Sequence, residues 1–114
     1  MSALQVTARL EIHDGKLAEF KEVASRCMQS VREKDSGTLR YDWFLNEEGT
    51  VCVVQEAYRD SAAVLEHVGN LGATMGDLLA VADMQLEVYG SPSVELAEAT
   101  VALGPKVYAH LQSI

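Results

Sequence analysis

The chain has 114 residues, 48% of them hydrophobic, which is enough for one domain with a substantial core and too little for two. Its 17 acidic and 9 basic residues give a formal net charge of −8, so nucleic acid and anionic membrane surfaces are unfavourable partners. No apolar run approaches the ~20 residues of a membrane helix, and residues 1–10 lack the basic start and long apolar stretch of a signal peptide, so we expect a cytoplasmic protein.

The first half of the chain predicts a strand, a helix and a hairpin. Apolar residues alternate with polar ones over 4–12, which is typical of a strand with one apolar face. Apolar residues then recur at spacings of three and four from Leu17 to Val31, which predicts an amphipathic helix that Asp14 would cap and residues 35–37 would end. Alternation over 38–45, turn formers at 46–49 and β-branched residues over 50–58 predict a β-hairpin.

The second half predicts a broken helix and a fourth strand. Asp60 can cap a helix to about Val68, and the glycines that follow predict an interruption before further helical turns around 77–82. Alternation returns over 84–89. The order β-α-β-β-α-β is that of the split βαβ, or ferredoxin-like, α+β fold with an antiparallel sheet, and we assign it to residues 1–90.

Residues 91–114 are expected to form a C-terminal extension that packs on the same domain or on a partner subunit. Pro92 can stand in the first turn of a short helix over about 94–102, and Gly104 and Pro105 would end it. Weak alternation over 106–111 suggests an edge strand.

The third predicted strand is apolar on both faces, which points to a homodimer. Val51, Val53 and Ala57 face one way, and Cys52, Val54 and Tyr58 face the other. The helices of a split βαβ unit cover only one side of the sheet, so a second copy is the simplest cover for the other side. Alternatively, the C-terminal extension folds back over the open face and leaves a monomer.

Two sequence motifs resemble those of a known family. The run G-T-L-R-Y-D-W at 37–43 resembles the G-x-x-x-Y-x-W/F opening of the second strand in the antibiotic biosynthesis monooxygenase family. The run from Glu56 through Y-R-D-S-A-A to His67 resembles that family's E-x-W/Y-x-D/S-x-x-A-x-x-x-H segment. With D-G-K at 14–16, the resemblance spans about residues 4–90. It implies a dimeric α/β barrel and, among several activities, cofactor-independent oxidation of quinols or aromatic polyketides.

The resemblance also suggests which residues carry the chemistry. It places His67 beside a cavity, where a side chain with a pKa near neutrality could serve as the catalytic base. The alternative is a structural histidine that bonds a carbonyl. The heme-degrading members resemble this chain in fold but use Asn, Trp and His at positions that correspond to Ala8, His67 and Asp77, so heme degradation is not expected.

Substrate binding is assigned to aromatic and flexible apolar side chains. Flat rings stack well on flat substrates, and Met75 with its neighbours Leu78 and Leu79 could form a mobile wall beside the glycines. The alternative for all of these residues is ordinary core packing. The predicted substrate-binding residues are Tyr41, Trp43, Tyr58 and Met75. Glu56 is expected to pair with Arg59 or Arg9 in a structural ion pair.

No cofactor or metal is expected. Cys27 and Cys52 have neither a C-x-x-C spacing nor a neighbouring histidine, so both are interpreted as buried thiols in a reducing compartment. His13 and His110 are expected to be solvated. The chain also lacks a glycine-rich phosphate loop and a G-x-S-x-G elbow.

The leading hypothesis is therefore a cofactor-independent monooxygenase that acts on a quinol or an aromatic polyketide-like phenol. The first alternative is a barrel of the same fold that binds a small aromatic or apolar ligand without converting it. The second is an isomerase or decarboxylase built on the same fold. Oxygen uptake with a hydroquinone separates the first hypothesis from the other two.

Overall fold

The computed structural model describes residues 3–114 and shows the predicted order of strands and helices. The elements are β1 (Leu4–Ile12), α1 (Leu17–Lys34), β2 (Thr38–Leu45), β3 (Val51–Tyr58), α2 (Ser61–Leu71), α3 (Ala73–Leu79), β4 (Ala82–Tyr89), α4 (Val94–Ala99), the 3-10 turn η1 (Val101–Leu103) and β5 (Lys106–Tyr108). None of the helices described between residues 3 and 114 combines the length and apolar character needed to span a bilayer.

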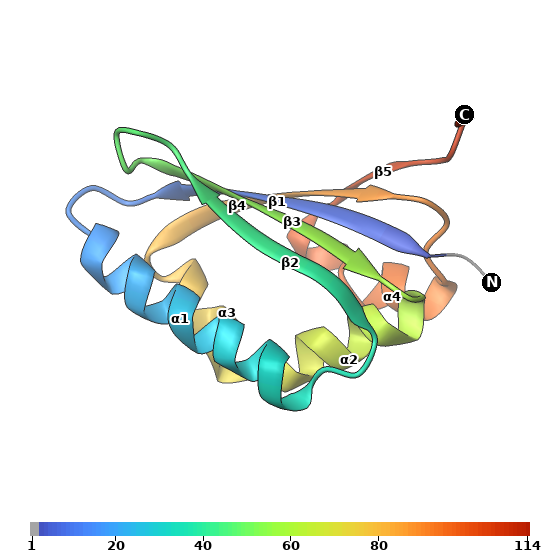
Figure 1. Cartoon of the computed structure of the whole chain (residues 1–114), viewed down its shortest axis with the longest axis horizontal. Helices are drawn as coiled ribbons and strands as arrows, with labels where there is room; N and C mark the ends of the chain where they lie inside the picture. Colours follow the sequence, from blue (N-terminus) through green and yellow to red (C-terminus); the bar gives the residue numbers. More distant parts are fainter. Residues whose placement is uncertain (1–2) are drawn as a thin grey trace.

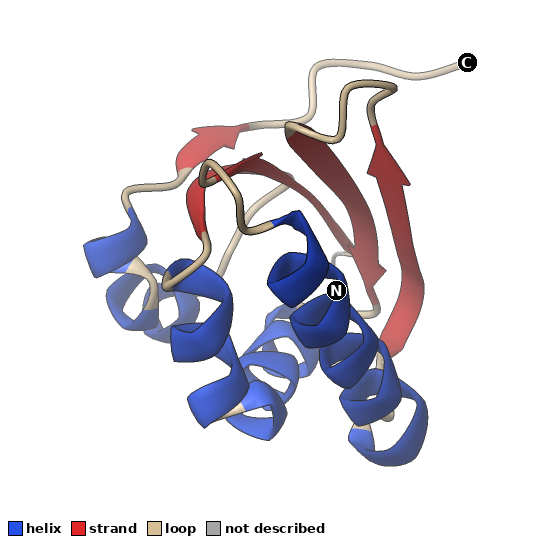
Figure 2. Cartoon of the chain, turned by 90° about the vertical axis from the view of Figure 1, so that its left-hand side faces the viewer, coloured by secondary structure: helices blue, strands red, loops and turns tan. Residues whose placement is uncertain are grey.

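The sheet has the ferredoxin-like order β2-β3-β1-β4, extended at one edge by β5. The first four strands are antiparallel, as predicted, and β5 runs parallel to β4, so the complete sheet is mixed. Figures 1 and 2 show the sheet curving over the helices, all of which lie on one side. The sheet of the single chain is open, and the α+β fold is confirmed.

Alternation along the strands separates an inner face from an outer face. Leu4, Val6, Ala8 and Leu10 of β1 are buried against the helices, whereas Gln5 and its odd-numbered neighbours, apart from Thr7, are exposed. The pairing register carries this alternation across the sheet, because residues paired side by side point to the same face. The inner face therefore includes Tyr41, Trp43, Val54, Glu56, Tyr58, Met84, Leu86 and Val88.

Both cysteines are free and buried, as predicted. Cys27 of α1 is 0% exposed and Cys52 of β3 is 2% exposed. Burial raises the pKa of each thiol to about 11. Both thiols are therefore protonated at neutral pH and pack as small apolar side chains.

Several predicted element boundaries are wrong. Asp14 does not cap α1. It lies in a turn closed by a bond from Lys16 N to His13 O, and Lys16 occupies the cap position without a side-chain bond. Asp60 does cap α2 and accepts a bond from Ala63 N at 2.9 Å. The helical break lies at Gly72, whose φ of 51° suits glycine, and α3 begins at once rather than near residue 77.

The helical part of the C-terminal extension lies on the helix side of the sheet, and β5 continues the sheet at its edge. Its helix α4 contacts α2, where Ser93 N donates to Ser61 Oγ at 2.9 Å and Leu96 is 3% exposed. The alternative in which the extension folds over the open face is therefore wrong for residues 91–108. Pro92 precedes the helix, and Ser93 caps it by accepting a bond from Leu96 N.

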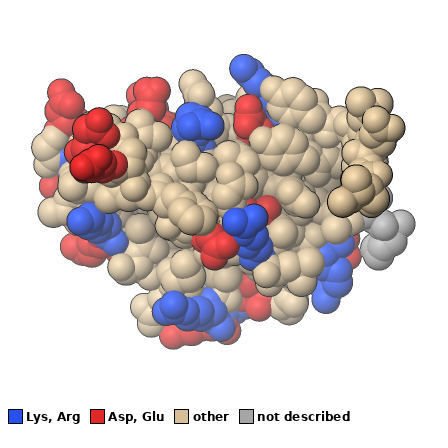
Figure 3. Space-filling view, turned by 45° about the horizontal axis from the view of Figure 1, so that its top comes forward, with Lys and Arg blue, Asp and Glu red and all other residues tan. Residues whose placement is uncertain are grey.

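The outer face of the sheet carries polar and apolar side chains together. Phe44 is 53% exposed and pairs in register with Val53, while Tyr89 and Tyr108 stack at 5.8 Å between ring centroids near the β5 edge. Figure 3, turned so that the sheet side comes forward, shows charged side chains scattered around a largely uncharged surface. Beyond β5 the chain continues past the sheet edge, and Leu111 is 90% exposed.

Candidate active site

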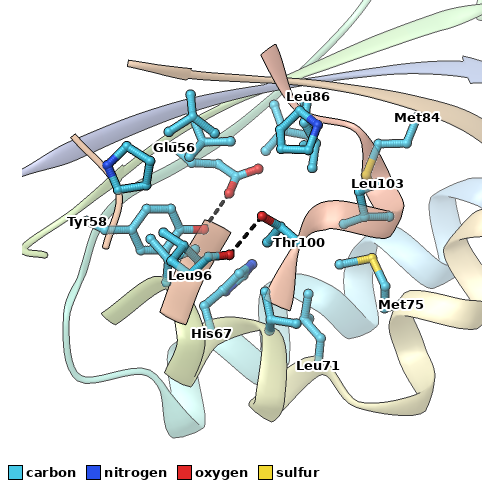
Figure 4. Close-up of a pocket in the computed structure, with 18 of the residues that line it drawn as sticks. Glu56, Tyr58, His67, Leu71, Met75, Met84, Leu86, Leu96, Thr100 and Leu103 are labelled. Atoms are coloured by element: carbon cyan, nitrogen blue, oxygen red, sulfur yellow. Dashed lines mark hydrogen bonds between the residues drawn. The ribbon is translucent and has the colours of Figure 1, made fainter. Parts of the chain in front are cut away.

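A cavity of about 310 Å³ lies between the inner face of the sheet, helices α2 and α3, and the C-terminal extension. Figure 4 shows it with Leu86 and Glu56 on the sheet side and His67 and Leu71 on the helix side. Its volume is at the small end of the ~300–1,000 Å³ range of ligand pockets. The space suits one small molecule of a few fused rings.

All five residues assigned to the site from sequence line this cavity. They are His67, Tyr41, Trp43, Tyr58 and Met75. Leu78, named as part of a mobile wall, also lines the cavity, whereas Leu79 is 37% exposed and does not. The fold thus brings the predicted base and the predicted binding residues together from β2, β3, α2 and α3.

His67 is held by a carboxylate that sequence reasoning assigned only to the end of a helix. Its Nδ1 lies 2.8 Å from Oδ2 of Asp35, the residue that caps the C-terminus of α1. Both side chains are buried, with exposures of 6% for His67 and 1% for Asp35. Asp35 also accepts bonds from Asn70 Nδ2 at 2.8 Å and Thr38 Oγ1 at 2.7 Å. Three donors therefore fix the carboxylate, and the carboxylate fixes the imidazole.

The charge states of this pair follow from burial and hydrogen bonding. Burial lowers the pKa of His67 against the opposing effect of Asp35, so the imidazole is neutral at pH 7. Burial alone would raise the pKa of Asp35, but bonds from Asn70, Thr38 and His67 outweigh it and lower that pKa. An ionised Asp35 accepts the proton on Nδ1. The lone pair on Nε2 is then left facing the cavity, where Figure 4 places the ring.

Aromatic rings surround the imidazole. The ring of His67 lies 5.1 Å from that of Tyr41 and 5.4 Å from that of Tyr58, centroid to centroid. Tyr41 also meets Trp43 edge to face at 5.6 Å. Trp43 Nε1 is buried and has no hydrogen-bond partner among the residues described. These rings form a wall that suits a flat ligand.

Glu56 is a second titratable side chain that lines the cavity, and the ion pair predicted for it is wrong. Its carboxylate accepts a hydrogen bond from Tyr58 Oη and lines the cavity. Arg59 instead lies 3.8 Å from Asp60, and Arg9 is exposed on the opposite face of the sheet. Burial raises the pKa of Glu56 to about 7, although the bond from Tyr58 opposes the shift. The position of Glu56 in the cavity could have been predicted from the alternation along β3. Glu56 lies on the same face of the strand as Val54 and Tyr58.

The C-terminal extension forms one side of the cavity. Leu96, Thr100 and Leu103 contribute side chains to the lining, and Leu103 lies beside Met75 and Met84 in Figure 4. The hydroxyl of Thr100 donates to Leu96 O at 2.9 Å, so it is occupied within its own helix. Most of this lining is therefore apolar.

Cofactor-binding features can be judged from the same lining. No Lys or Arg is among the described residues around the cavity, so it offers no cation for a phosphate or carboxylate. Within residues 3–114, no three His, Cys, Asp or Glu side chains gather in an arrangement suited to a metal ion. His13, predicted to be solvated, lies outside the cavity, 40% exposed and 2.9 Å from Asp83.

Solved structures share this fold. MupZ from Pseudomonas fluorescens aligns with a TM-score of 0.86 and 21% identity over 98% of this chain and 88% of its own. SnoaB from Streptomyces nogalater, described as a cofactor-independent oxygenase, aligns with a TM-score of 0.68 and 17% identity over 82% of this chain and 97% of its own. A putative antibiotic biosynthesis monooxygenase from Caulobacter crescentus aligns with a TM-score of 0.69 and 24% identity over 75% of this chain and 86% of its own.

Comparison of the sequence with protein-family models identifies the family. No curated protein matches the chain significantly. A family model matches residues 4–73, which is more than half of the chain and includes β1 through α2 with Tyr41, Glu56 and His67. The chain belongs to the antibiotic biosynthesis monooxygenase family.

Proposed function

We propose that the protein is a cofactor-independent monooxygenase that oxidises a small, uncharged quinol or phenol, with His67 as the catalytic base. The observation that carries the proposal is the 2.8 Å contact between Asp35 and Nδ1 of His67, which leaves Nε2 as the basic atom facing the cavity. A histidine held in one tautomer by a buried carboxylate is a well-oriented proton acceptor.

The chemistry needs little beyond this base. A phenolate or quinol anion can itself give an electron to dioxygen, so the protein has to remove a proton, hold the oxyanion and exclude water. The cavity combines an apolar lining with the polar atoms of His67, Tyr41 and Glu56. This composition matches those three requirements.

The lining also suggests the substrate class. Without a Lys or Arg among the described lining residues, a carboxylate or phosphate on the substrate would be desolvated without a counter-charge. The rings of Tyr41, Trp43 and Tyr58 favour a flat aromatic partner. Family membership and the similarity to SnoaB, a cofactor-independent oxygenase, support the same reaction class.

Oxygen uptake tests this proposal. Wild-type protein with an uncharged hydroquinone should consume dioxygen faster than buffer, and His67→Gln should slow it about 100-fold. The matched control is His13→Gln, which disrupts an exposed His–Asp pair outside the cavity and should stay within twofold of wild type. Saturable binding of the quinol without oxygen uptake or any product would contradict the proposal and favour a binding protein.

A second candidate is an isomerase or decarboxylase that moves protons without dioxygen. It is favoured by the presence of two proton-transfer groups, Glu56 and His67, on opposite sides of one cavity. Conversion of an unsaturated carbonyl compound at an equal rate in air and under argon would support this alternative against the oxygenase.

We further propose a cytoplasmic homodimer in which two sheets meet by their outer faces to form a barrel. Phe44, Val51, Val53 and Ala57 give that face an apolar strip, and the C-terminal extension leaves it uncovered. Two buried, unpaired thiols suit a reducing compartment.

A further inference from the structure

We propose that Glu56 is a second catalytic residue, a general acid that protonates the peroxide formed when the substrate combines with dioxygen. This inference rests on the monooxygenase function proposed above. It adds a proton donor opposite the base, so that one cavity holds a group that takes a proton and a group that gives one.

The position of Glu56 suits a donor. In the sheet its neighbours in register are Val6 of β1 and Tyr41 of β2, which places its side chain on the inner face. Figure 4 shows the carboxyl group entering the cavity from the sheet while His67 enters from α2. A substrate between them would meet Nε2 on one side and the carboxyl group on the other.

Tyr58 determines which oxygen of Glu56 meets the substrate. The phenol of Tyr58 donates to Oε1, and Oε2 has no hydrogen-bond partner among the residues described. Burial raises the pKa of Tyr58, so the phenol keeps its proton and remains a donor. In the neutral acid the proton therefore sits on Oε2, facing the cavity. Tyr58 thus orients Glu56 in the same way that Asp35 orients His67.

The surroundings of Glu56 favour its protonated form. The titratable groups that face it are Tyr58 on β3, Tyr41 on β2, Cys27 on α1 and His67 on α2, and none of them is a cation at pH 7. No charged side chain of β1, β4 or the C-terminal extension lines the cavity. With no positive charge to stabilise the carboxylate, burial holds the pKa of Glu56 at about 7, high enough for a donor at neutral pH.

The overall reaction converts a phenol and dioxygen to a quinone and water. His67 and Glu56 are the only proton-transfer groups that it requires. His67 accepts the phenolic proton, and the electron-rich ring carbon reduces dioxygen and bonds to it, which gives a peroxide anion on that carbon. Glu56 delivers its proton to the anion to form a hydroperoxide. The same carbon then loses its hydrogen as a proton to the Glu56 carboxylate while the O–O bond breaks and the second C=O bond forms. The departing hydroxide takes the proton from the His67 imidazolium and leaves as water, so both residues return to their starting forms.

Glu56→Gln tests this role because glutamine keeps the size and the acceptor for Tyr58 but cannot transfer a proton. We expect quinone formation to fall about 100-fold with KM changed less than threefold, and superoxide release to rise, since the unprotonated adduct can revert. In wild type, kcat/KM should fall above pH 7 as Glu56 loses its proton, and this fall should be absent from the residual activity of Glu56→Gln. The matched control is Glu87→Gln, because Glu87 accepts a 2.7 Å bond from Tyr89 Oη in the same i, i+2 arrangement on the other face of the sheet. It should stay within twofold of wild type.

Tyr58→Phe gives an independent readout that a purely structural role would not produce. The bond from Tyr58 lowers the pKa of Glu56, so its removal should move the alkaline limb of the pH profile to higher pH. If wild type turns over and Glu56→Gln keeps the same rate and the same alkaline limb, the role of Glu56 is overturned while the monooxygenase proposal stands. Absence of oxygen uptake by wild-type protein would overturn both.

Discussion

The carboxylate of Asp35 and the imidazole of His67 lie 2.8 Å apart, Oδ2 to Nδ1, and join the end of α1 to the middle of α2. Asn70, one turn after His67, bonds the other oxygen of the same carboxylate at 2.8 Å. The packing of the two helices and the orientation of His67, the proposed catalytic base, therefore depend on one buried side chain.

Asp35→Asn should reduce oxygen uptake by roughly 10- to 100-fold. An amide at this position can donate to Nδ1, which would put the imidazole proton on Nε2 and remove the lone pair from the cavity. The free energy of unfolding should also fall by about 1–3 kcal/mol because a buried hydrogen-bond network is weakened. Initial rates and urea denaturation measure the two effects.

The control for that variant is Asp83→Asn, which changes the exposed partner of His13. Its activity and stability should match those of wild type, since exposed pairs contribute little. Equal activity of Asp35→Asn and wild type would show that the tautomer of His67 does not matter to the reaction.

Stability should respond to pH through Glu56. Its pKa is raised from 4.5 to about 7 in the folded protein, so its contribution to stability is fully present below pH 4.5 and is lost as pH rises through 7. Glu56→Gln has no such loss. The stability of the variant relative to wild type should increase by roughly 3 kcal/mol at most between pH 4.5 and 8. Urea denaturation at several pH values measures the difference, and a difference independent of pH would contradict the raised pKa.

The inner row of the sheet could be predicted from the sequence because strand geometry is strictly periodic. The alternation that put Tyr41 and Trp43 in one row also puts them on the inner face in the structure, and Tyr58 follows through the hairpin register. The same parity includes Glu56, so its place in the cavity was available from sequence. The ion pair predicted between Glu56 and Arg59 does not form, because Glu56 points to the inner face while Arg59 follows the last residue of β3 and lies 3.8 Å from Asp60.

Two features of the site could not be read from local patterns. Asp35 and His67 are 32 positions apart, and their contact depends on how α1 packs on α2. The placement of α4 over the cavity depends on tertiary contacts such as the Ser93–Ser61 bond. Periodicity and helix-capping residues report on local structure and do not predict contacts between residues far apart in the sequence.

Leu103→Ala should change the substrate range. Leu103 lies over the cavity beside Met75 and Met84, so removal of its side chain enlarges the space available to a ligand. We expect KM for a one-ring quinol to rise severalfold and larger fused-ring quinols to become better substrates, with kcat changed little. Steady-state kinetics with a series of quinols provides the measurement. The control is Leu111→Ala, at a position that is 90% exposed. An unchanged size preference in Leu103→Ala would argue against the cavity as the binding site.

Phe44→Glu should dissociate the proposed homodimer. Phe44 and its register partner Val53 lie on the outer face, so a carboxylate there would be buried without a partner in a sheet-to-sheet interface. Light scattering of wild-type protein should give twice the chain mass of 12.4 kDa, and the variant should give the chain mass. A wild-type particle of 12.4 kDa would exclude the dimer at the concentration used.

Isotope labelling tests the central claim most directly. Under dioxygen labelled with oxygen-18, a single turnover of wild-type protein with an uncharged phenol should place one labelled atom in the quinone and the other in water. His67→Gln should give no labelled quinone on the same timescale, while His13→Gln should match wild type. Product formed without the label, or labelled product formed equally fast without His67, would contradict the oxygenase mechanism built on the His67–Asp35 pair.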